Sequence, residues 1–439
     1  MPEAPADIKI FLFLRDFMDY HSDRYLDYSL LIYKKDVLIS VLPANIVENQ
    51  LNDTKLIVVL SAMSGETDKL IKLTSDLSDN FLSSEYDVVI SSGEQVSAGA
   101  LAGLLNSQGI KSQSRLGWQI PIVTSGDHKS ARIEAIHSKE LIKILESNEV
   151  IIIPGFQGIN TEGRITTLGR GGSDTSAVAI AAAVKADFCD IYTDVDGVYT
   201  SDPNKVSTAK RLDKISYEEM LEMASLGAKV LQTRSVETAM NNNVVLRVLS
   251  SFSELGSDKK GTLVCSEDSI ADKKIVTGIA ASTNDAKITL TGIKDKPGVA
   301  AEILGVLADN NINVDMIVQN ISNDRKTTDL TYTVPHDEVK RAKILMEDLS
   351  LNLSYKDLIV DSNISKISIV GVGMRSNAGV ASQMFRVLSH NDINIDVIST
   401  SEIKISVLIN KDLTEKALNT LCLLYTSPSP RDATLSRMP

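Results

Sequence analysis

The sequence predicts an α/β protein with a buried, mostly parallel sheet in its first half and a pair of repeated modules in its second half. Between Lys55 and about Asp268, apolar runs of strand length alternate with helical patterns. Continuous apolar runs of this kind are typical of parallel strands that are covered on both faces. Beyond that region, the chain repeats a pattern of strand, glycine loop, amphipathic helix and strand.

Six apolar runs are the candidate strands of the first half. They are KLIVVLSA (55–62), YDVVISS (86–92), IPIVTS (120–125), VIIIPGF (150–156), FCDIYTD (188–194) and VVLRVLS (244–250). Ligands of open parallel sheets bind at the carboxyl ends of the strands. We therefore expect the polar and glycine-rich strings that follow these runs to meet at one edge of the sheet.

The string TTLGRGGSDTSA (166–177) carries the strongest signal, and it leads into the helix-like stretch AVAIAAAVKA (177–186). Two adjacent glycines let the backbone approach a ligand closely, while Ser173 and Asp174 favour a helix N-cap. A helix N-terminus attracts anions, and Arg170 adds a planar fork suited to a carboxylate or a phosphate. For this string taken alone, a capped helix after a glycine turn is the favoured interpretation, because short glycine motifs often occur by chance.

Four further strings occur in a fixed order around this one. They are SAMSGETD (61–68), SSGEQVSA (91–98), DIYTDVDGVYTSDPN (190–204) and LGAKVLQTRSVETA (226–239). Together the five strings closely resemble those of aspartate kinases, which are members of the amino-acid kinase family. The resemblance runs from about Leu56 to about Leu421. It implies a three-layer αβα amino-acid kinase domain with a mostly parallel sheet over residues 55–268.

The internal repeat aligns residues 298–320 with residues 379–401 at a constant offset, and each copy follows a strand, KITLTGI (287–293) or KISIVGV (366–372). The recurring pattern resembles tandem ACT domains, which are small ferredoxin-like βαββαβ modules that bind amino acids. On this resemblance we expect a first ACT domain at 275–358 and a second, truncated one at 364–423. A pair of assembly modules without any ligand is the alternative.

The two ends of the chain do not fit the resemblance. Aspartate kinases begin with a strand that carries Lys-Phe-Gly-Gly-Thr-Ser or a close variant, and this sequence contains no such string. We expect residues 1–54 to be a non-native N-terminus and this chain to have weak activity, if any. Residues 424–439 contain two Ser-Pro pairs and no apolar period, so we expect a non-native, disordered tail.

Composition limits the classes of partner. The net charge of −12 argues against a nucleic acid or an anionic membrane as partner. The cysteines Cys189, Cys265 and Cys422 match no zinc spacing and no disulfide framework, which favours a cytoplasmic location. No run approaches the roughly 20 apolar residues that a membrane helix needs.

The resemblance implies transfer of the γ-phosphoryl group of ATP to the β-carboxylate of L-aspartate, giving 4-phospho-L-aspartate. This is the first step of lysine, threonine and methionine biosynthesis and leads towards diaminopimelate. A carboxylate nucleophile is already ionised at neutral pH, because the ordinary pKa of Asp is about 3.9. Catalysis therefore needs positioning and charge neutralisation rather than a general base, and Mg²⁺ would be held through the ATP phosphates and not by protein ligands.

The resemblance also implies roles for individual residues. Arg170 should clasp a substrate carboxylate, Asp174 should orient the catalytic lysine of the N-terminal loop, and Lys229 should reach the ATP phosphates. The other residues implied for aspartate are Thr67, Glu94, Gly171, Gly172 and Ser173. The other residues implied for the nucleotide are Ser61, Ser173, Tyr192, Thr193, Asp194, Val198, Tyr199, Thr200, Ser201, Asp202 and Pro203.

When each of these residues is considered alone, a purely structural role also fits it. Asp194 can cap a turn, Glu94 and Lys229 can be solvated charges, and Tyr199 can belong to the core. Two other functions also stay open: another amino-acid kinase acting on a different carboxylate, and a catalytically dead regulatory chain that binds amino acids. The repeat argues against the first of these, because glutamate and uridylate kinases of the family lack paired ACT modules.

The ACT resemblance implies inhibition by lysine, threonine or both. The candidate effector residues of the first module are Asp295, Pro297, Gly298, Asn313, Asp315, Gln319 and Asn320. Those of the second module are Met374, Ser376, Asn394, Asp396, Ser399, Thr400 and Glu402. ACT modules pair side by side, so we expect a homo-oligomer or an α₂β₂ assembly with a shorter chain that contains ACT modules.

Overall fold

The computed structural model describes residues 8–13, 44, 46–48, 51, 55–228, 230–252, 261–271, 274–321, 326–350 and 353–425. The chain divides into two compact units. The first draws on Met1–Val198, Arg211–Ala224 and Lys229–Ala271, and the second on Tyr199–Lys210, Ser225–Ala228 and Asp272–Pro439. Two short segments that we expected in the kinase domain, 199–210 and 225–228, therefore belong to the second unit.

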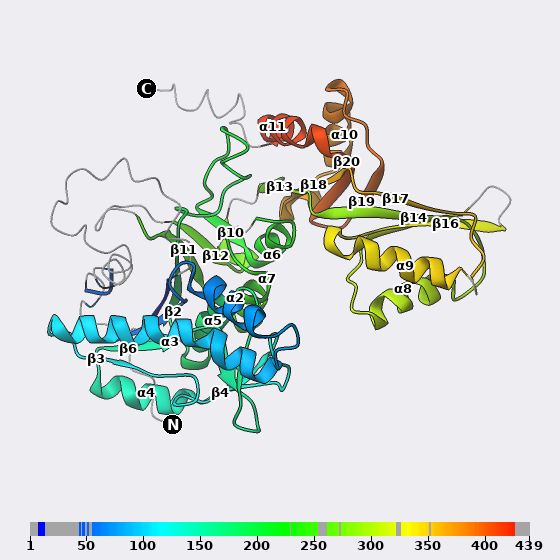
Figure 1. Ribbon diagram of the computed structural model, residues 1–439. Coiled ribbons are helices and arrows are strands. Elements are labelled where there is room, and N and C mark those ends of the chain that lie inside the picture. Colours follow the sequence, from blue (N-terminus) through cyan, green and yellow to red (C-terminus); the bar gives the residue numbers. More distant parts are fainter. Residues whose placement is uncertain are drawn as a thin grey trace, which may run out of the picture. The chain divides into compact units, whose positions relative to one another are not determined.

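An eight-stranded sheet lies at the centre of the first unit (Figure 1). In spatial order its strands are β10 (Lys214–Ser216), β12 (Thr262–Cys265), β11 (Leu246–Ser250), β9 (Phe188–Thr193), β1 (Ile8–Phe13), β2 (Lys55–Leu60), β6 (Val150–Pro154) and β3 (Ser112–Ser114). Neighbouring strands run parallel except for the antiparallel pair β11 and β12. This arrangement confirms the mostly parallel sheet that the apolar runs predicted.

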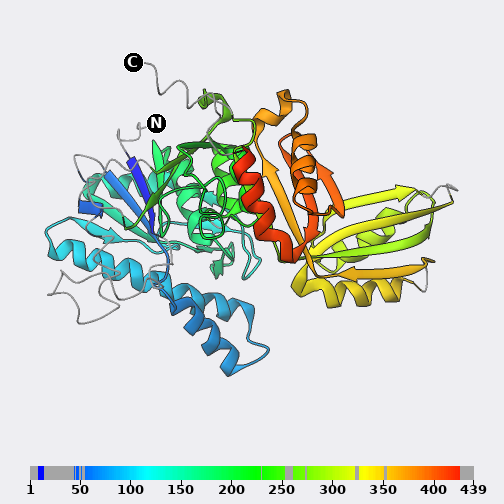
Figure 2. The same ribbon diagram turned by 90° about the horizontal axis from the view of Figure 1, so that it is seen from above.

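Part of the stretch that we placed outside the kinase domain lies inside the first unit. Strand β1 pairs with both β2 and β9, and the view from above shows it in dark blue among the other strands (Figure 2). Ala44, Ile46 and Val47 are buried in the same hydrophobic cluster as β2 and β6. The boundary at Lys55 is therefore too late.

The prediction of a strand at 86–92 is wrong, because these residues lie within the long helix α3 (Ser83–Ser107). Its buried residues recur at helical spacing, as Asp87, Ile90, Glu94, Leu101 and Leu105 illustrate. By length and composition this helix is apolar enough to cross a membrane, and it is the only one of that kind among the described residues. Half of its most apolar 18-residue segment is buried inside the fold.

Both faces of the central sheet are covered. Leu56 and Val58 of β2 and Val150 of β6 share a hydrophobic cluster with Ala98 and Leu101 of α3. The intervening residues of these strands point to the other face and are fully buried as well. Other helices of the unit that the structure describes are α2 (Glu66–Leu77), α4 (Ser138–Ser147), α5 (Gly172–Val184), α6 (Tyr217–Ser225), α7 (Thr233–Asn242) and the short η1 (Glu267–Ser269).

A small second sheet lies beside the loops that follow the main strands. Its order is β5 (Ile133–Ile136), β4 (Ile122–Thr124), β7 (Gln157–Ile159) and β8 (Ile165–Thr167). The predicted strand at 120–125 is therefore real, but it belongs to this sheet and not to the parallel one. The glycine-rich string (166–177) begins with the last two residues of β8, so the small sheet helps to place that string.

Two four-stranded sheets, each with two α-helices and one or two short 3₁₀ helices, build most of the second unit. The first sheet has the order β15 (Asp315–Ile321), β16 (Thr327–Pro335), β14 (Asp285–Lys294) and β17 (Asp357–Asp361). Helices α8 (Val299–Asp309) and α9 (Val339–Leu349), preceded by η2 (His336–Glu338), lie on one face of it (Figure 1). We call this part the first module.

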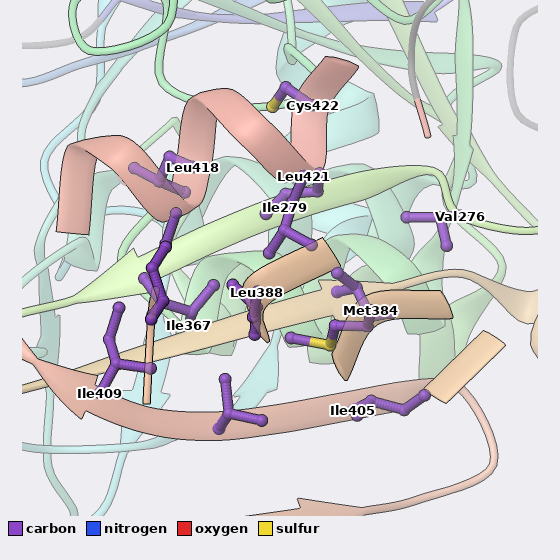
Figure 3. Close-up of a cluster of buried hydrophobic side chains, with 14 of the residues drawn as sticks. Val276, Ile279, Ile367, Met384, Leu388, Ile405, Ile409, Leu418, Leu421 and Cys422 are labelled. Atoms are coloured by element: carbon purple, nitrogen blue, oxygen red, sulfur yellow. The ribbon is translucent and has the colours of Figure 1, made fainter. Parts of the chain in front are cut away.

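The second sheet has the order β13 (Gly278–Ser282), β18 (Ile364–Val370), β20 (Lys404–Asn410) and β19 (Val397–Thr400). Its helices are η3 (Val372–Ser376), α10 (Val380–His390), η4 (Lys411–Leu413) and α11 (Thr414–Tyr425). Figure 3 shows their packing, with Met384 and Leu388 of α10 and Leu418 of α11 against Ile367 of β18. We call this part the second module.

Two module boundaries differ from those that we expected. Strand β13 lies within the range given to the first module, yet it pairs with β18 of the second. Leu424 and Tyr425, which we assigned to the tail, are the last residues of α11. The Tyr425 hydroxyl donates a hydrogen bond to the backbone carbonyl of Val380, 2.9 Å away, which ties the end of α11 to α10.

Candidate active site

A pocket of about 890 Å³ opens in the first unit where several strands end. Ser61 follows β2, Phe156 follows β6 by two residues, and Thr193 ends β9. The pocket brings together most of the residues that the five strings predicted for the substrates. These are Ser61, Thr67, Glu94, Arg170, Gly171, Gly172, Ser173, Asp174, Thr193 and Asp194.

The glycine-rich string forms the turn into α5 on the wall of this pocket. Gly171 is the N-cap of α5 and has a φ of 67°, in the left-handed region that favours glycine. A Cβ at this position would lie 1.8 Å from the side chain of Gln232, so no larger residue fits. Our expectation that Ser173 or Asp174 caps the helix is wrong, because both lie in its first turn.

Asp174 is a buried carboxylate on this first turn, with 2% of its surface exposed. The backbone N–H of Gln232 donates to its Oδ2 over 3.4 Å, and its Oδ1 has no hydrogen-bond partner among the described residues. Burial raises the pKa of Asp174 to about 7. A buried carboxylate of this kind is stabilised by a cation, so the position suits a group that orients a lysine or another positive charge.

Glu94 lies on α3 on the pocket wall and is 4% exposed. Its Oε1 accepts a hydrogen bond from the backbone N–H of Ala62, 3.2 Å away, in the loop after β2. The same loop packs closely on α3, since a Cβ on Gly93 would lie 2.9 Å from Cβ of Ala62. The carboxylate is therefore fixed beside the loop that carries Ser61 and leads to Thr67.

The charged residues that line the pocket are of both signs. Asp68, Glu94, Asp174 and Asp194 are acidic, and Arg170 is the basic residue that the sequence predicted. The structure adds a second cation on the wall, Lys129, which sequence reasoning missed. A signal was present, because Lys129 lies just beyond the apolar run at 120–125, as the other predicted site strings lie beyond theirs.

Several residues predicted for the nucleotide do not line this pocket. Tyr192 is buried in the hydrophobic cluster of β2 and α3, and burial raises the pKa of its hydroxyl. Val198 is buried, and its N–H donates to Thr262 Oγ1 at 2.8 Å. Residues 199–203 belong to the second unit. Lys229 lies outside the described residues, so its role stays a prediction.

The residues predicted for an effector lie on the loops and strands of the two modules. Asp295, Pro297 and Gly298 are exposed in the turn between β14 and α8, with Gly298 as the N-cap of α8. Glu402 forms an ion pair with Arg375, Oε2 to Nε 3.3 Å. The others are Asn313, Asp315, Gln319 and Asn320 around β15, Met374 and Ser376 in η3, and Asn394, Asp396, Ser399 and Thr400 around β19.

Two of these predicted effector residues are engaged in ion pairs that join the modules. Asp315 Oδ2 of the first module lies 2.5 Å from Lys366 Nζ of the second. Asp396 Oδ2 of the second module lies 3.1 Å from Lys287 Nζ of the first. An effector that used either carboxylate would have to compete with a lysine of the protein itself.

Models of known families match three parts of the chain. The amino acid kinase family matches residues 34–250, and the ACT domain matches residues 287–349 and 367–422. The first match begins ahead of Lys55, in agreement with the buried residues at 44–47. The two ACT matches coincide with the two modules of the second unit.

Curated relatives cover most of the chain. An aspartate kinase of Pseudomonas fluorescens is 50% identical over 378 residues, which are 85% of this chain and 90% of the relative. An aspartokinase of Pseudomonas aeruginosa is 48% identical over 377 residues, covering 85% of this chain and 90% of the relative. An aspartokinase of Helicobacter pylori is 46% identical over 375 residues, 84% of this chain and 91% of the relative.

Solved structures share the fold. The aspartate kinase from Synechocystis has a TM-score of 0.50 and 34% identity, and the match covers 97% of this chain and 70% of that one. E. coli aspartokinase III in complex with aspartate and ADP has a TM-score of 0.75 and 23% identity, covering 96% of this chain and 100% of that one. At that identity the second likeness concerns the fold alone.

Proposed function

The chain belongs to the aspartate kinase family, and from this premise we propose that it transfers the γ-phosphoryl group of ATP to the β-carboxylate of L-aspartate. The product is 4-phospho-L-aspartate. The observation that carries the proposal is the pocket of the first unit, in which Glu94, Arg170 and Asp174 line one cavity at the ends of the strands. The same residues are those that the resemblance implied for substrate binding and catalysis.

The chemistry suits a site without a general base. The attacking carboxylate is ionised at neutral pH, so the enzyme has to overcome the repulsion between two anions. Arg170 supplies a guanidinium for one substrate carboxylate, and Glu94 supplies an acceptor for the substrate ammonium. The first turn of α5, with Gly172 and Ser173 on the pocket wall, offers a helix N-terminus to an anion.

We place the nucleotide near Ser61, Thr193 and Asp194, which line the same pocket. Mg²⁺ would accompany the ATP phosphates and neutralise part of their charge. Oxygen atoms are the ligands that Mg²⁺ prefers, and the resemblance implies that the ATP phosphates supply them. Lys229 is proposed, on the resemblance, to reach the phosphates as well.

We further propose that lysine, threonine or both inhibit the enzyme. We also propose that the reaction is the first step of lysine, threonine and methionine biosynthesis. The two ACT matches support an amino-acid effector site in the second unit. ACT modules pair side by side, which supports a homo-oligomer or an assembly with a shorter chain of the same modules. A cytoplasmic location fits the cysteines, because Cys189, Cys265 and Cys422 are buried and form no disulfide.

The test is a hydroxamate assay that requires both ATP and aspartate. It should be run on this chain and on a chimaera in which a relative's N-terminal segment, with Lys-Phe-Gly-Gly-Thr-Ser, precedes Leu56. We expect turnover with aspartate, none with glutamate, and a higher kcat in the chimaera. Activity with glutamate instead would indicate a different kinase, and aspartate binding without turnover in either protein would indicate a regulatory chain.

A further inference from the structure

The loop that carries Lys129 is tied to the pocket by a buried carboxylate that the proposed function leaves unexplained. Asp87 of α3 is fully buried, and His128 Nδ1 lies 2.7 Å from its Oδ2. The backbone N–H of Lys129 donates to both of its oxygens, at 3.1 and 3.2 Å, and Thr167 Oγ1 donates to Oδ1 at 2.7 Å. One carboxylate thus fixes two residues of the pocket wall, Lys129 and Thr167.

The side chain of Lys129 is held in position, as its backbone is. Its ammonium lies 4.5 Å from the centroid of the Tyr86 ring, in the arrangement of a cation–π contact. Tyr86 and Lys129 both line the pocket. Lys129 also has a φ of 67°, a conformation that side-chain-bearing residues adopt only where their surroundings hold them. Here Asp87 does so through the backbone N–H.

The loops that carry the two cations of the pocket pack directly on each other. Gly169, the residue before Arg170, has a φ of 76°, and a Cβ there would lie 3.1 Å from the carbonyl oxygen of Lys129. The positions of Lys129 and Arg170 are therefore set together. Among the described residues these two are the cations that line the pocket.

Aspartate carries two carboxylates and one ammonium. Glu94 suits the ammonium, and Arg170 suits one carboxylate, which leaves the other in a pocket that contains four acidic side chains. Burying a carboxylate away from water costs a large desolvation free energy if it has no ion-pair partner, and a nearby ammonium offsets this cost.

We propose that Lys129 is a further substrate-contacting residue that binds the carboxylate of aspartate not held by Arg170, and that Asp87 is the positioning residue that holds Lys129 in place. The inference rests on the proposed function. It makes the site a two-cation clamp for a dicarboxylate, so Lys129 also selects against a monocarboxylate of similar size, such as asparagine.

The first experiment measures aspartate affinity with the full chain by calorimetry and the KM for aspartate with the active chimaera. We expect Lys129→Ala to raise the Kd and the KM for aspartate by about 10-fold or more, with the KM for ATP unchanged within about twofold. Lys129→Arg should recover most of the affinity. Lys143→Ala, at an exposed site on α4 that does not line the pocket, is the matched control.

The outcomes separate the inference from the proposed function. If the parent neither binds nor turns over aspartate, the proposed function fails and the inference fails with it. If the parent binds aspartate and Lys129→Ala binds it equally well, the inference alone is overturned. In that case Lys129 is only a partner of the Tyr86 ring at the pocket rim.

The second experiment tests whether Asp87 acts through Lys129. We expect Asp87→Asn to weaken aspartate binding in the parent and to have little further effect when Lys129 is already alanine. Thr167→Val, which removes another contact of Asp87, serves if Asp87→Asn does not fold. Equal losses from Asp87→Asn in both backgrounds would show that Asp87 is merely structural and would overturn its assignment.

Discussion

Lys366 Nζ of the second module lies 2.5 Å from Oδ2 of Asp315 in the first, and 3.3 Å from Oδ2 of Asp285. A related pair runs the other way, from Lys287 of the first module to Asp396 of the second. Asp315 and Asp396 are corresponding residues of the internal repeat, and both lysines come from the strand that precedes their own copy. The repeated sequence thus forms reciprocal ion pairs between its two copies.

We expect Lys366→Ala to lower the free energy of unfolding by about 1–3 kcal/mol, because it leaves Asp285 and the more exposed Asp315 without their shared ammonium. Burial alone would lower the pKa of Lys366, but the hydrogen bond and charge of Asp315, with Asp285, raise it, so the ammonium is charged at any neutral pH. Denaturant unfolding of the full chain, followed by a probe in the second unit, measures the effect. Lys287→Ala should cost less, because Lys287 is more exposed than Lys366; equal costs would contradict this account.

Asp174→Asn should stabilise the protein in a pH-dependent way. The carboxyl ionises near its ordinary pKa in the unfolded chain, whereas burial raises the pKa to about 7 in the folded one. Below about pH 4 the Asp174 carboxyl is protonated in both states and does not lower the free energy of unfolding. As pH rises from about 4 to about 7, the unfolded chain ionises first, so the free energy of unfolding falls. Above about pH 7 the loss is complete and stays constant. A shift of about three units corresponds to about 4 kcal/mol as an upper bound.

Thermal unfolding of the parent and of Asp174→Asn near pH 8 and near pH 4 checks this expectation. The variant should have the higher Tm near pH 8 and nearly the same Tm in acid, while losing activity in the chimaera. An equal gain in Tm at both pH values would mean that the substitution acts through packing instead of through charge.

Arg170→Ala should raise the KM for aspartate by about 10- to 100-fold, because a hydrogen bond to a charged group contributes about 1.5–3 kcal/mol. The KM for ATP should change little. Lys229→Ala should show the reverse pattern. Arg132→Ala, at an exposed site outside the pocket, is the control for general loss of charge. An unchanged KM for aspartate in Arg170→Ala would remove Arg170 from the substrate site.

Lysine or threonine should bind to the second unit, with Asp295 or Glu402 accepting the effector ammonium. Calorimetric titration of the full chain with each amino acid measures the binding, and Asp295→Ala and Glu402→Ala locate it. Glu402 is paired with Arg375 in the structure, so binding there requires that this ion pair opens. No heat with either amino acid, in protein shown to be folded, would leave the modules with an assembly role.

Much of the fold and half of the site were predictable because both depend on local patterns. Buried parallel strands such as 150–154 read as apolar runs, and the loops that follow them carry polar and glycine-rich strings. The run at 86–92 was misread because Val88, Val89 and Ile90 have strong β-propensity, whereas the buried residues of α3 recur at helical spacing over a much longer stretch.

The rest depended on contacts that no local pattern contains. Tyr192 lies in the string that was predicted to bind the nucleotide (190–204), but its side chain packs into the hydrophobic core. Lys129 follows the apolar run at 120–125, but its backbone is also held by a buried acid 42 residues earlier, Asp87, and that contact has no local signal. The ion pairs between the modules could be predicted only if the two copies of the repeat were known to face each other through their first strands. The repeat itself does not indicate that arrangement.

The pairing of β13 with β18 makes the second module discontinuous in the chain, with the whole first module inserted between two adjacent strands of its sheet. Ser282 pairs with Lys366, so residues 283–365 must be synthesised before that sheet can close. During translation β13 therefore leaves the ribosome as an unpaired edge. Meanwhile, the inserted first module can fold from its own local contacts. Its folding brings β13 and β18 together and so shortens the loop that has to close. The first module thus assists the folding of the second.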